Sequence, residues 1–160
     1  MDDRSEPLNK DEPRARYDRD LYSWAVEQAA LLRSGRVTEV DALNIAEELD
    51  DVGNEQYDKL ESALRLILLH LLKWDHQPDR RSRSWWASIQ IQRKHVEKVL
   101  RKNPGLKPFI SEAIGDAYGV ARLEAAKQTK LHPDIFPEEC PFSRDEIMQR
   151  PIQWPRPIEK

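Results

Sequence analysis

The most apolar stretch of this 160-residue chain is Leu64-Arg65-Leu66-Ile67-Leu68-Leu69-His70-Leu71-Leu72. It lies in a predicted helix of about residues 55–74, one face of which carries apolar side chains at helical spacing: Leu60, Leu64, Ile67, Leu71 and Trp74. More leucines cover the rest of its C-terminal half, and a helix that is apolar nearly all round is surrounded by other helices. At about half the length of a bilayer span, the stretch indicates the centre of a helical bundle and not a transmembrane helix.

Two blocks of opposite charge flank this stretch. Residues 39–58 contain eight acidic residues and no Lys or Arg, whereas residues 80–102 contain eight basic residues and a single acid, Glu97. The net charge of −3 indicates no particular partner, so the segregation of charge is the informative feature. Carboxylates crowded on one stretch repel one another, and we therefore predict that the blocks pair. The predicted bonds join Glu47 or Glu48 to one of three arginines: Arg80, Arg81 and Arg83.

Breaks and caps along the chain predict four further long segments. A helix over about residues 21–34 begins after Asp18 or Asp20 and ends at Gly35, and a second helix follows from Thr38 until Gly53 ends or bends it. A fourth helix begins near Ser82 or Ser84 and continues to the break at residues 103–105, and a fifth covers about residues 108–129. Residues 1–16 are polar and aperiodic, which predicts a disordered or loosely held arm. We predict one helical domain over residues 17–160.

The residue pattern of the sequence changes after Leu131. Prolines recur there with an aromatic or apolar residue close by, which predicts an extended strap that packs its aromatic side chains onto the bundle. One short helix of about residues 143–148 interrupts the strap, because Ser143 and Glu146 have the spacing of a capping box. The predicted fold is therefore all-α: a bundle of about five main helices, a C-terminal strap rich in proline and aromatic residues, and one short extra helix.

Five blocks of sequence occur in an order that resembles a known family. They are Tyr17-Asp18-Arg19-Asp20-Leu21-Tyr22-Ser23-Trp24-Ala25, Ala46-Glu47-Glu48-Leu49, Leu69-His70-Leu71-Leu72-Lys73-Trp74, Gln77-Pro78-Asp79-Arg80-Arg81-Ser82-Arg83-Ser84-Trp85 and Phe136-Pro137-Glu138-Glu139-Cys140-Pro141-Phe142. Together they resemble the bacterial family catalogued as domain of unknown function 29, over about residues 17–154. The resemblance implies a small, all-helical cytoplasmic protein. It implies no established reaction, so it assigns no catalytic residue.

The cysteine content and the N-terminus bear on the compartment. Cys140 is the one cysteine, so no intrachain disulfide can form, which fits a reducing cytosol. The first residues lack the apolar core of a signal peptide, and we expect a cytoplasmic protein that does not enter a membrane. Cys140 follows Glu139, whose carboxylate would raise the pKa of the thiol if close. We therefore interpret Cys140 as a structural residue and not as a nucleophile.

The first candidate site consists of Arg80, Arg81, Arg83, Trp85 and Trp86. Arginine binds phosphate and carboxylate in a bidentate manner, and tryptophan stacks on bases. The site therefore has three interpretations: structural pairing with the acidic block, which we favour, binding of nucleic acid or phosphate along the basic helix of residues 80–102, and binding of an acidic protein. Trp85 and Trp86 point about 100° apart on a helix, so one of them should be partly exposed, as tryptophans at binding surfaces are.

The second candidate site is a polar network of Glu47, Glu48 and His70. Carboxylates and imidazoles on facing helices can hold a metal in a bundle, but a Glu-x-x-His pair among these residues is absent. His70 faces Ile67 and Trp74 on an apolar helix, so we interpret it as a core histidine bonded to a carboxylate or a carbonyl. We predict no metal site and no cofactor.

The absence of a phosphate-binding loop, of metal-ligand spacing and of a catalytic triad favours a non-enzymatic binding or adaptor module. We expect a protein partner or self-association, with a homodimer through an exposed tryptophan such as Trp86 as one form. Two alternatives stay open. One is a nucleic-acid- or phosphate-binding protein that uses the basic helix of residues 80–102. The other is a helical-bundle enzyme or metal protein centred on His70.

Overall fold

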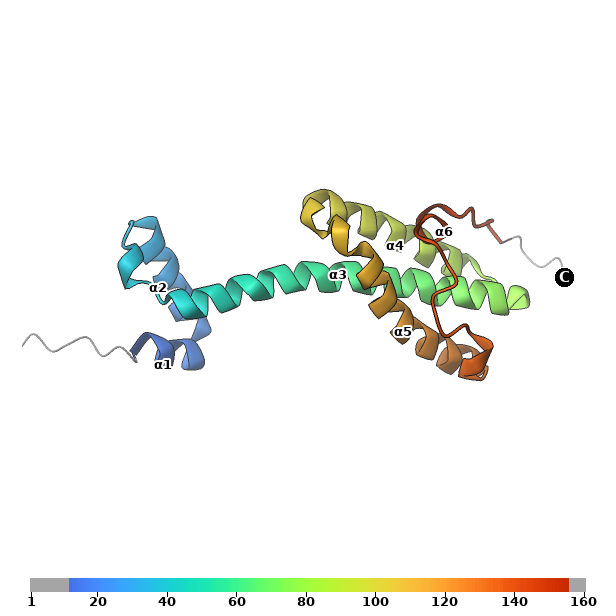
Figure 1. Cartoon of the computed structure of the whole chain (residues 1–160), viewed down its shortest axis with the longest axis horizontal. Helices are drawn as coiled ribbons and strands as arrows, with labels where there is room; N and C mark the ends of the chain where they lie inside the picture. Colours follow the sequence, from blue (N-terminus) through green and yellow to red (C-terminus); the bar gives the residue numbers. More distant parts are fainter. Residues whose placement is uncertain (1–11, 156–160) are drawn as a thin grey trace, which may run out of the picture. The chain divides into compact units, whose positions relative to one another are not determined.

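A computed structural model describes residues 12–155 of the chain, with side chains described from residue 16 onward. The described residues form helices joined by short 3-10 turns, and no strand occurs among them (Figure 1). The helices are α1 (Glu12–Arg19), α2 (Leu21–Arg33), α3 (Ala42–His76), α4 (Arg83–Lys102), α5 (Ile110–Thr129) and α6 (Arg144–Gln149). The 3-10 turns are η1 (Val37–Glu39), η2 (Pro78–Arg80), η3 (Pro104–Phe109) and η4 (Pro133–Ile135). The predicted all-α fold class is confirmed.

The chain divides into two compact units, Met1–Gly53 and Asn54–Lys160. The predicted single domain of residues 17–160 stays a prediction, because compactness does not show whether the units fold independently. Most of the predicted N-terminal arm, residues 1–11, lies outside the described residues. Residues 12–16 of that arm are helical and belong to α1, and a loosely held arm stays a prediction. Pro13 lies in the first turn of α1, where its missing N–H costs no hydrogen bond.

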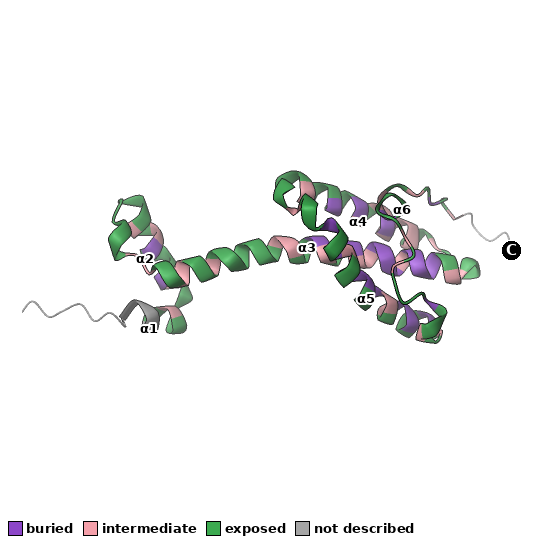
Figure 2. Ribbon diagram, viewed as in Figure 1, coloured by how far each residue is buried: buried purple, intermediate pink, exposed green. Residues whose placement is uncertain are grey.

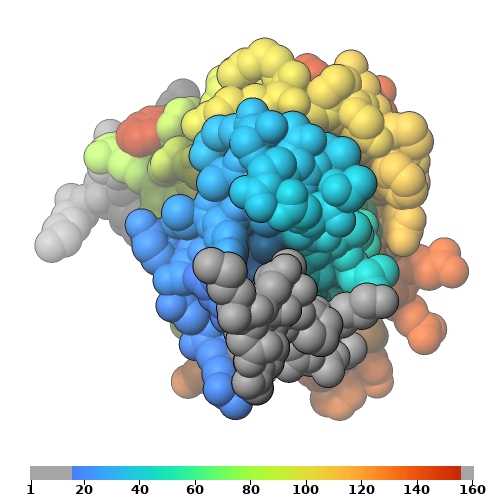
Figure 3. Space-filling view, turned by 90° about the vertical axis from the view of Figure 1, so that its left-hand side faces the viewer, coloured from blue at the N-terminus to red at the C-terminus, as the bar shows by residue number. Residues whose placement is uncertain are grey.

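In the N-terminal unit, local signals set the limits of α2. The Asp20 side chain accepts a hydrogen bond from the Ser23 amide at 3.0 Å, which caps the helix as predicted. Gly35 follows the last turn with φ of 76°, a left-handed conformation that favours glycine. Trp24 on α2 is buried and meets the Tyr17 ring edge-on at 4.8 Å between centroids. In the space-filling view, α2 and the start of α3 form a continuous surface of this unit (Figure 3).

Helix α3 is longer than predicted, because it joins the predicted second and third helices into one helix of 35 residues. Gly53 was expected to end or bend the second helix, and it does not end it. A glycine inside a helix costs only about 1 kcal/mol relative to alanine, which good helix formers on both sides can offset. Gly53 also has the negative φ of an ordinary helical residue, since Gly35 is the described glycine with positive φ.

The core of the C-terminal unit surrounds the leucine-rich half of α3. Helices α4 and α5 cross this half, and their buried residues face it (Figures 1 and 2). The α3 residues with at most 1% of their surface exposed are Leu60, Leu64, Ile67, Leu68, Leu71 and Leu72. Alanines at 113, 117, 121 and 125 form the buried face of α5 and let it come close. Each fully buried leucine contributes about 1.5–3 kcal/mol, so this half of α3 is the main source of stability in the unit.

The C-terminal strap covers the rest of this core, as predicted. Phe136, Ile147 and Ile152 are its buried apolar side chains. Helix α6 begins with the predicted capping box, in which the Ser143 side chain and the Glu146 side chain each accept a backbone N–H bond of the other residue. A strap with little regular structure cannot satisfy its own backbone groups, so its carbonyls need donors from the helices beneath it.

Two glycine substitutions test the description of α3 and α2. We expect Gly53→Ala to raise the free energy of unfolding by about 0.5–1 kcal/mol, because an added Cβ meets no atom within 4 Å and alanine favours the helix. Gly35→Ala should lower it by about 1–2 kcal/mol, because alanine is strained at positive φ. Urea unfolding followed by circular dichroism measures both changes. A destabilised Gly53→Ala protein would contradict a continuous α3.

Candidate functional site

Two of the three arginines of the first candidate site contact residues of their own unit. The Arg81 Nε donates to the Trp74 carbonyl at 2.9 Å, and its guanidinium lies 5.2 Å from the Trp74 ring centroid. Arg83 lies 5.3 Å from the ring centroid of Trp154. Arg80 is exposed in η2, and its side chain makes no hydrogen bond to another described residue. Arg81 therefore satisfies one of the free carbonyls at the C-terminal end of α3.

The tryptophans of this site contact Lys73 and the strap. Trp85 and Trp86 are both half-buried. The Lys73 Nζ lies 4.3 Å from the Trp85 ring centroid. The Trp86 Nε1 donates to the Ile152 carbonyl at 3.0 Å, and its ring meets that of Trp154 edge-on at 4.8 Å. The strap thus occupies much of the Trp86 surface, and Trp154 is the tryptophan with the larger exposed fraction, 52%.

Glu48 and His70 have partners that the sequence does not reveal. The Tyr17 hydroxyl donates to Glu48 at 2.8 Å, and this bond, together with burial and nearby carboxylates, raises the pKa of Tyr17 to about 12. The His70 Nδ1 lies 2.8 Å from the Leu66 carbonyl, one helical turn back, and donates to it. Burial and the nearby Lys73 ammonium lower the pKa of His70, which keeps the imidazole neutral at neutral pH. A carbonyl partner for His70 is one of the two predicted kinds.

The network of Glu47, Glu48 and His70, and the pairing of these carboxylates with Arg80, Arg81 or Arg83, stay predictions. Glu47 and Glu48 belong to the N-terminal unit, and the three arginines belong to the C-terminal unit. Within its own unit, Glu48 is satisfied by Tyr17, and Arg81 is satisfied by Trp74.

Two buried cations were missed from the sequence. Lys73 is 9% exposed, and its Nζ donates to Gln128 at 2.8 Å. Burial lowers its pKa. Arg93 is 6% exposed and donates to the carbonyls of Ile147 at 2.8 Å and Glu146 at 3.2 Å. Each lies on an apolar face of a helix. The sequence does not reveal the distant hydrogen-bond partner that allows such a cation to be buried.

Cys140 and the carboxylates offer no assembled reaction centre. Cys140 is half-buried, its Sγ lies 3.6 Å from the Phe142 carbonyl, and burial raises the pKa of the thiol. A raised pKa leaves less thiolate at neutral pH, which disfavours a nucleophile. Among the described residues, His, Cys, Asp and Glu do not gather in groups of three or more that could hold a metal ion.

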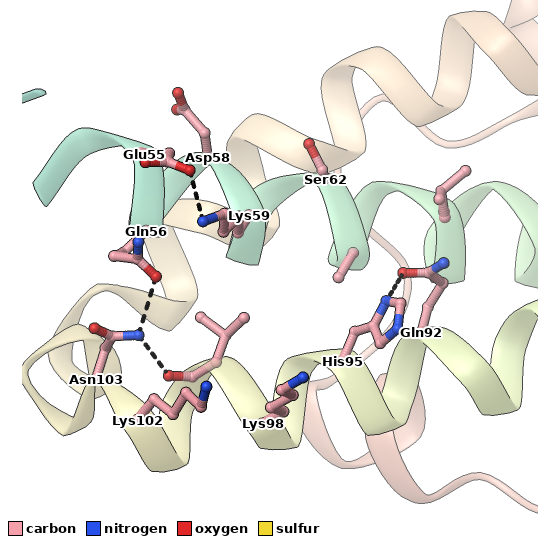
Figure 4. Close-up of a pocket in the computed structure, with 13 residues that line it drawn as sticks. Glu55, Gln56, Asp58, Lys59, Ser62, Gln92, His95, Lys98, Lys102 and Asn103 are labelled. Atoms are coloured by element: carbon pink, nitrogen blue, oxygen red, sulfur yellow. Dashed lines mark hydrogen bonds and ion pairs between the residues drawn. The ribbon is translucent and has the colours of Figure 1, made fainter. Parts of the chain in front are cut away.

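A concave surface of the C-terminal unit lies between α3 and α4, and it was not predicted. This groove has a volume of about 540 Å³ (Figure 4). Its apolar lining comes from Ala63, Leu66 and Val99. Its polar lining is Glu55, Gln56, Asp58, Lys59, Ser62, Gln92, His95, Lys98, Lys102 and Asn103. The exposed positions recur at helical spacing on both helices, but their convergence depends on how α3 and α4 pack.

The α4 wall of the groove is basic. Lys98 and Lys102 are exposed and project from α4 toward the space between the helices (Figure 4). On the α3 wall, Lys59 pairs with Glu55 at 2.6 Å, and Asp58 points away from α4 (Figure 4). The groove therefore presents an apolar floor beside two lysines that have no carboxylate partner among the described side chains.

One end of the groove is closed by an amide pair. The Asn103 Nδ2 donates to the Gln56 Oε1 at 3.3 Å and to the Val99 carbonyl at 3.0 Å. This pair links the C-terminal end of α4 to α3 and holds the two walls together there. At the other end, the His95 Nδ1 donates to the Gln92 Oε1 at 3.2 Å on the same helix.

A family comparison places the chain. The model of the family described as Domain of unknown function DUF29 matches residues 16–152. The chain belongs to this family. The match contains both walls of the DUF29 groove and most of the C-terminal strap. Searches of curated proteins and of solved structures gave no significant match. None of the described helices combines the length and apolar content that a membrane span requires.

Alanine variants of Arg81 and Arg80 test whether Arg81 has a structural role at the end of α3. We expect Arg81→Ala to lower the free energy of unfolding by about 1–3 kcal/mol, because the Trp74 carbonyl and ring lose a charged partner. Arg80→Ala should change it by less than about 0.5 kcal/mol, as exposed substitutions usually do. Urea unfolding measures both. Equal stability of the two variants would show that Arg81 does not cap α3.

The lowered pKa of His70 predicts that the stability of the protein depends on pH. Its folded-state pKa lies below the ordinary value of 6.5, so the unfolded chain binds the proton first as the pH falls. The stabilisation is complete above about pH 6.5 and is lost as the pH falls below it, toward the lowered pKa. We expect wild type to lose more free energy of unfolding than His70→Gln between about pH 7.5 and pH 5.5. His132→Gln, at an exposed histidine, is the control, and identical pH profiles for wild type and His70→Gln would contradict this assignment.

Proposed function

We propose that this protein is a non-enzymatic binding module whose α3–α4 groove accepts an acidic, amphipathic helix of a protein partner. The observation that carries the proposal is the combination of an apolar floor with the basic α4 wall in one groove. Helices bind to such grooves by laying their apolar face on the floor, with anchor residues spaced three and four apart.

The charge of the groove selects among partners. Lys98 and Lys102 lie one turn apart on α4, so acidic residues one turn apart on a bound helix can meet both. A basic helix would face these lysines without compensation, and like charges held together oppose binding. The floor contacts would supply affinity, and the lysines would supply orientation and salt dependence.

The first candidate site supports this choice of surface. Arg81 and Arg83 already contact Trp74 and Trp154, and Trp86 is engaged by the strap. Lys98 and Lys102 are exposed and carry no comparable structural contact. Lys98 and Lys102 thus place part of the accessible positive charge of the basic block of residues 80–102 at the groove, while Arg80 is exposed elsewhere.

Peptide binding tests the proposal directly. The protein carries a fluorophore at its N-terminus, is held at nanomolar concentration, and is titrated with a designed helical peptide of Leu, Ala and Glu. We expect saturable binding that weakens at high salt, and a loss of affinity of about tenfold or more in the double variant Lys98→Glu/Lys102→Glu. Lys107→Glu/Lys127→Glu changes the net charge equally at exposed positions away from the groove and should bind as wild type does.

Two further probes complete the experiment. The same peptide with each Glu replaced by Lys should not bind, and neither should a single-stranded DNA oligonucleotide of similar length. Binding of the oligonucleotide alone, lost in Lys98→Glu/Lys102→Glu, would assign the basic helix to nucleic acid and overturn the proposal. Failure of the acidic peptide to bind would overturn it as well.

A further inference from the structure

The N-terminal half of α3 has the chemistry that the groove selects. Ile45, Leu49 and Val52 recur at helical spacing and form an apolar stripe. In the C-terminal half of α3 the same spacing continues through Leu60, Ala63 and Ile67, which are buried in the core. In the N-terminal stripe Ile45 is half-buried, whereas Leu49 is 64% exposed and Val52 is 56% exposed.

Acidic side chains occupy the opposite side of this half of α3. Glu47, Asp50 and Asp51 are exposed, and no described basic side chain forms an ion pair with them. Asp51 points about 160° away from Leu49 around the helix, so the acids lie outside the stripe. Residues 42–53, which we name the docking segment, therefore form an acidic amphipathic helix with an uncovered apolar face.

The surrounding N-terminal unit buries few of its described apolar residues. Trp24 is the buried apolar residue of this unit among those described. Its other large apolar side chains include several with at least half of their surface exposed: Leu21, Tyr22, Val26, Val37 and Leu43. These exposed side chains lie on α2, η1 and the start of α3.

We infer that the partner is a second copy of this chain, whose docking segment lies in the α3–α4 groove of the first copy. The inference rests on the proposed function and names the helix that occupies the groove. The apolar stripe matches the floor at Ala63, Leu66 and Val99. The acids match Lys98 and Lys102, so the two surfaces are complementary in charge as well as in polarity.

If each copy docks its segment in the groove of the other, the assembly is a closed dimer. Each copy has one docking segment and one groove, so two copies related by a two-fold axis use both segments and both grooves. The contact then forms twice, and no docking surface is left for a third copy. The acidic block of residues 39–58 thereby meets part of the basic block of residues 80–102, with the partners on different chains.

Sedimentation across a range of protein concentrations tests the inference. We expect wild type to shift from monomer to dimer as the concentration rises. Leu49→Glu/Val52→Glu should raise the dissociation constant of the dimer by about tenfold or more, because it places charge on the stripe. Val120→Glu/Leu123→Glu makes the same change at exposed positions of α5 and should dimerise as wild type does. Circular dichroism confirms that each variant is folded.

A charge swap makes the test specific. Glu47→Lys/Asp51→Lys makes the docking segment basic, and Lys98→Glu/Lys102→Glu makes the groove acidic. Each double variant alone should stay monomeric at concentrations where wild type is dimeric. An equimolar mixture should dimerise, because each segment then meets a groove of opposite charge in the other protein.

The outcomes separate this inference from the proposed function. A wild-type chain that is monomeric at every concentration, yet binds the acidic peptide, would overturn the second copy and leave the groove as a binding site for another protein. A dimer that persists in Leu49→Glu/Val52→Glu, or a mixture of the swapped variants that stays monomeric, would also overturn the inference. Tighter peptide binding by Leu49→Glu/Val52→Glu than by wild type, at concentrations where wild type is dimeric, would support it.

Discussion

The structure of the C-terminal unit depends on one constraint, which is that the leucine-rich half of α3 must be kept from water on every side. Two crossing helices cover only part of a helix surface. The strap covers the remainder with Phe136, Ile147 and Ile152. Because an extended chain forms no backbone hydrogen bonds within itself, the strap carbonyls lack the partners that a helix would provide. The fold meets this need with side-chain donors from the helices.

Those donors explain why the basic block is not a uniform surface. Arg93 and Arg122 donate to strap carbonyls, and Trp86 and Tyr118 do the same. The planar guanidinium with its several N–H groups suits this task better than a lysine does. The lysines at positions 98 and 102 are exposed in the groove instead. Within the basic block, Arg93 thus bonds to the strap, whereas Lys98 and Lys102 face the groove.

Helix α3 is divided in a related way. Its C-terminal half is buried in a core, while its N-terminal half carries an apolar stripe with exposed residues and acids on the other side. We propose that this amphipathic half-helix and the groove of opposite charge form the two sides of one association. Both lie within the part of the chain that matches the DUF29 family. We therefore propose association, and not a chemical reaction, as the role that best accounts for these residues.

The sequence by itself determined the features that depend on neighbouring residues. The leucine periodicity of α3, the Asp20 and Ser82 caps, the stop at Gly35 and the capping box at Ser143 were all predictable, because each is set within a few residues. A local signal also produced the main error. Gly53 resembles a helix end, yet α3 continues through it.

Only the tertiary structure decided which long side chains meet. Arg81 donates to the Trp74 carbonyl across the end of α3. Arg93 donates to the Ile147 carbonyl and Lys73 to the Gln128 amide, and both partners lie more than 50 residues along the chain. The groove depends likewise on the packing of α3 against α4, where Asn103 bonds to Gln56. Periodicity reports which face of a helix is apolar, but not which neighbour lies against it. For that physical reason the site could be seen only once the helices were packed.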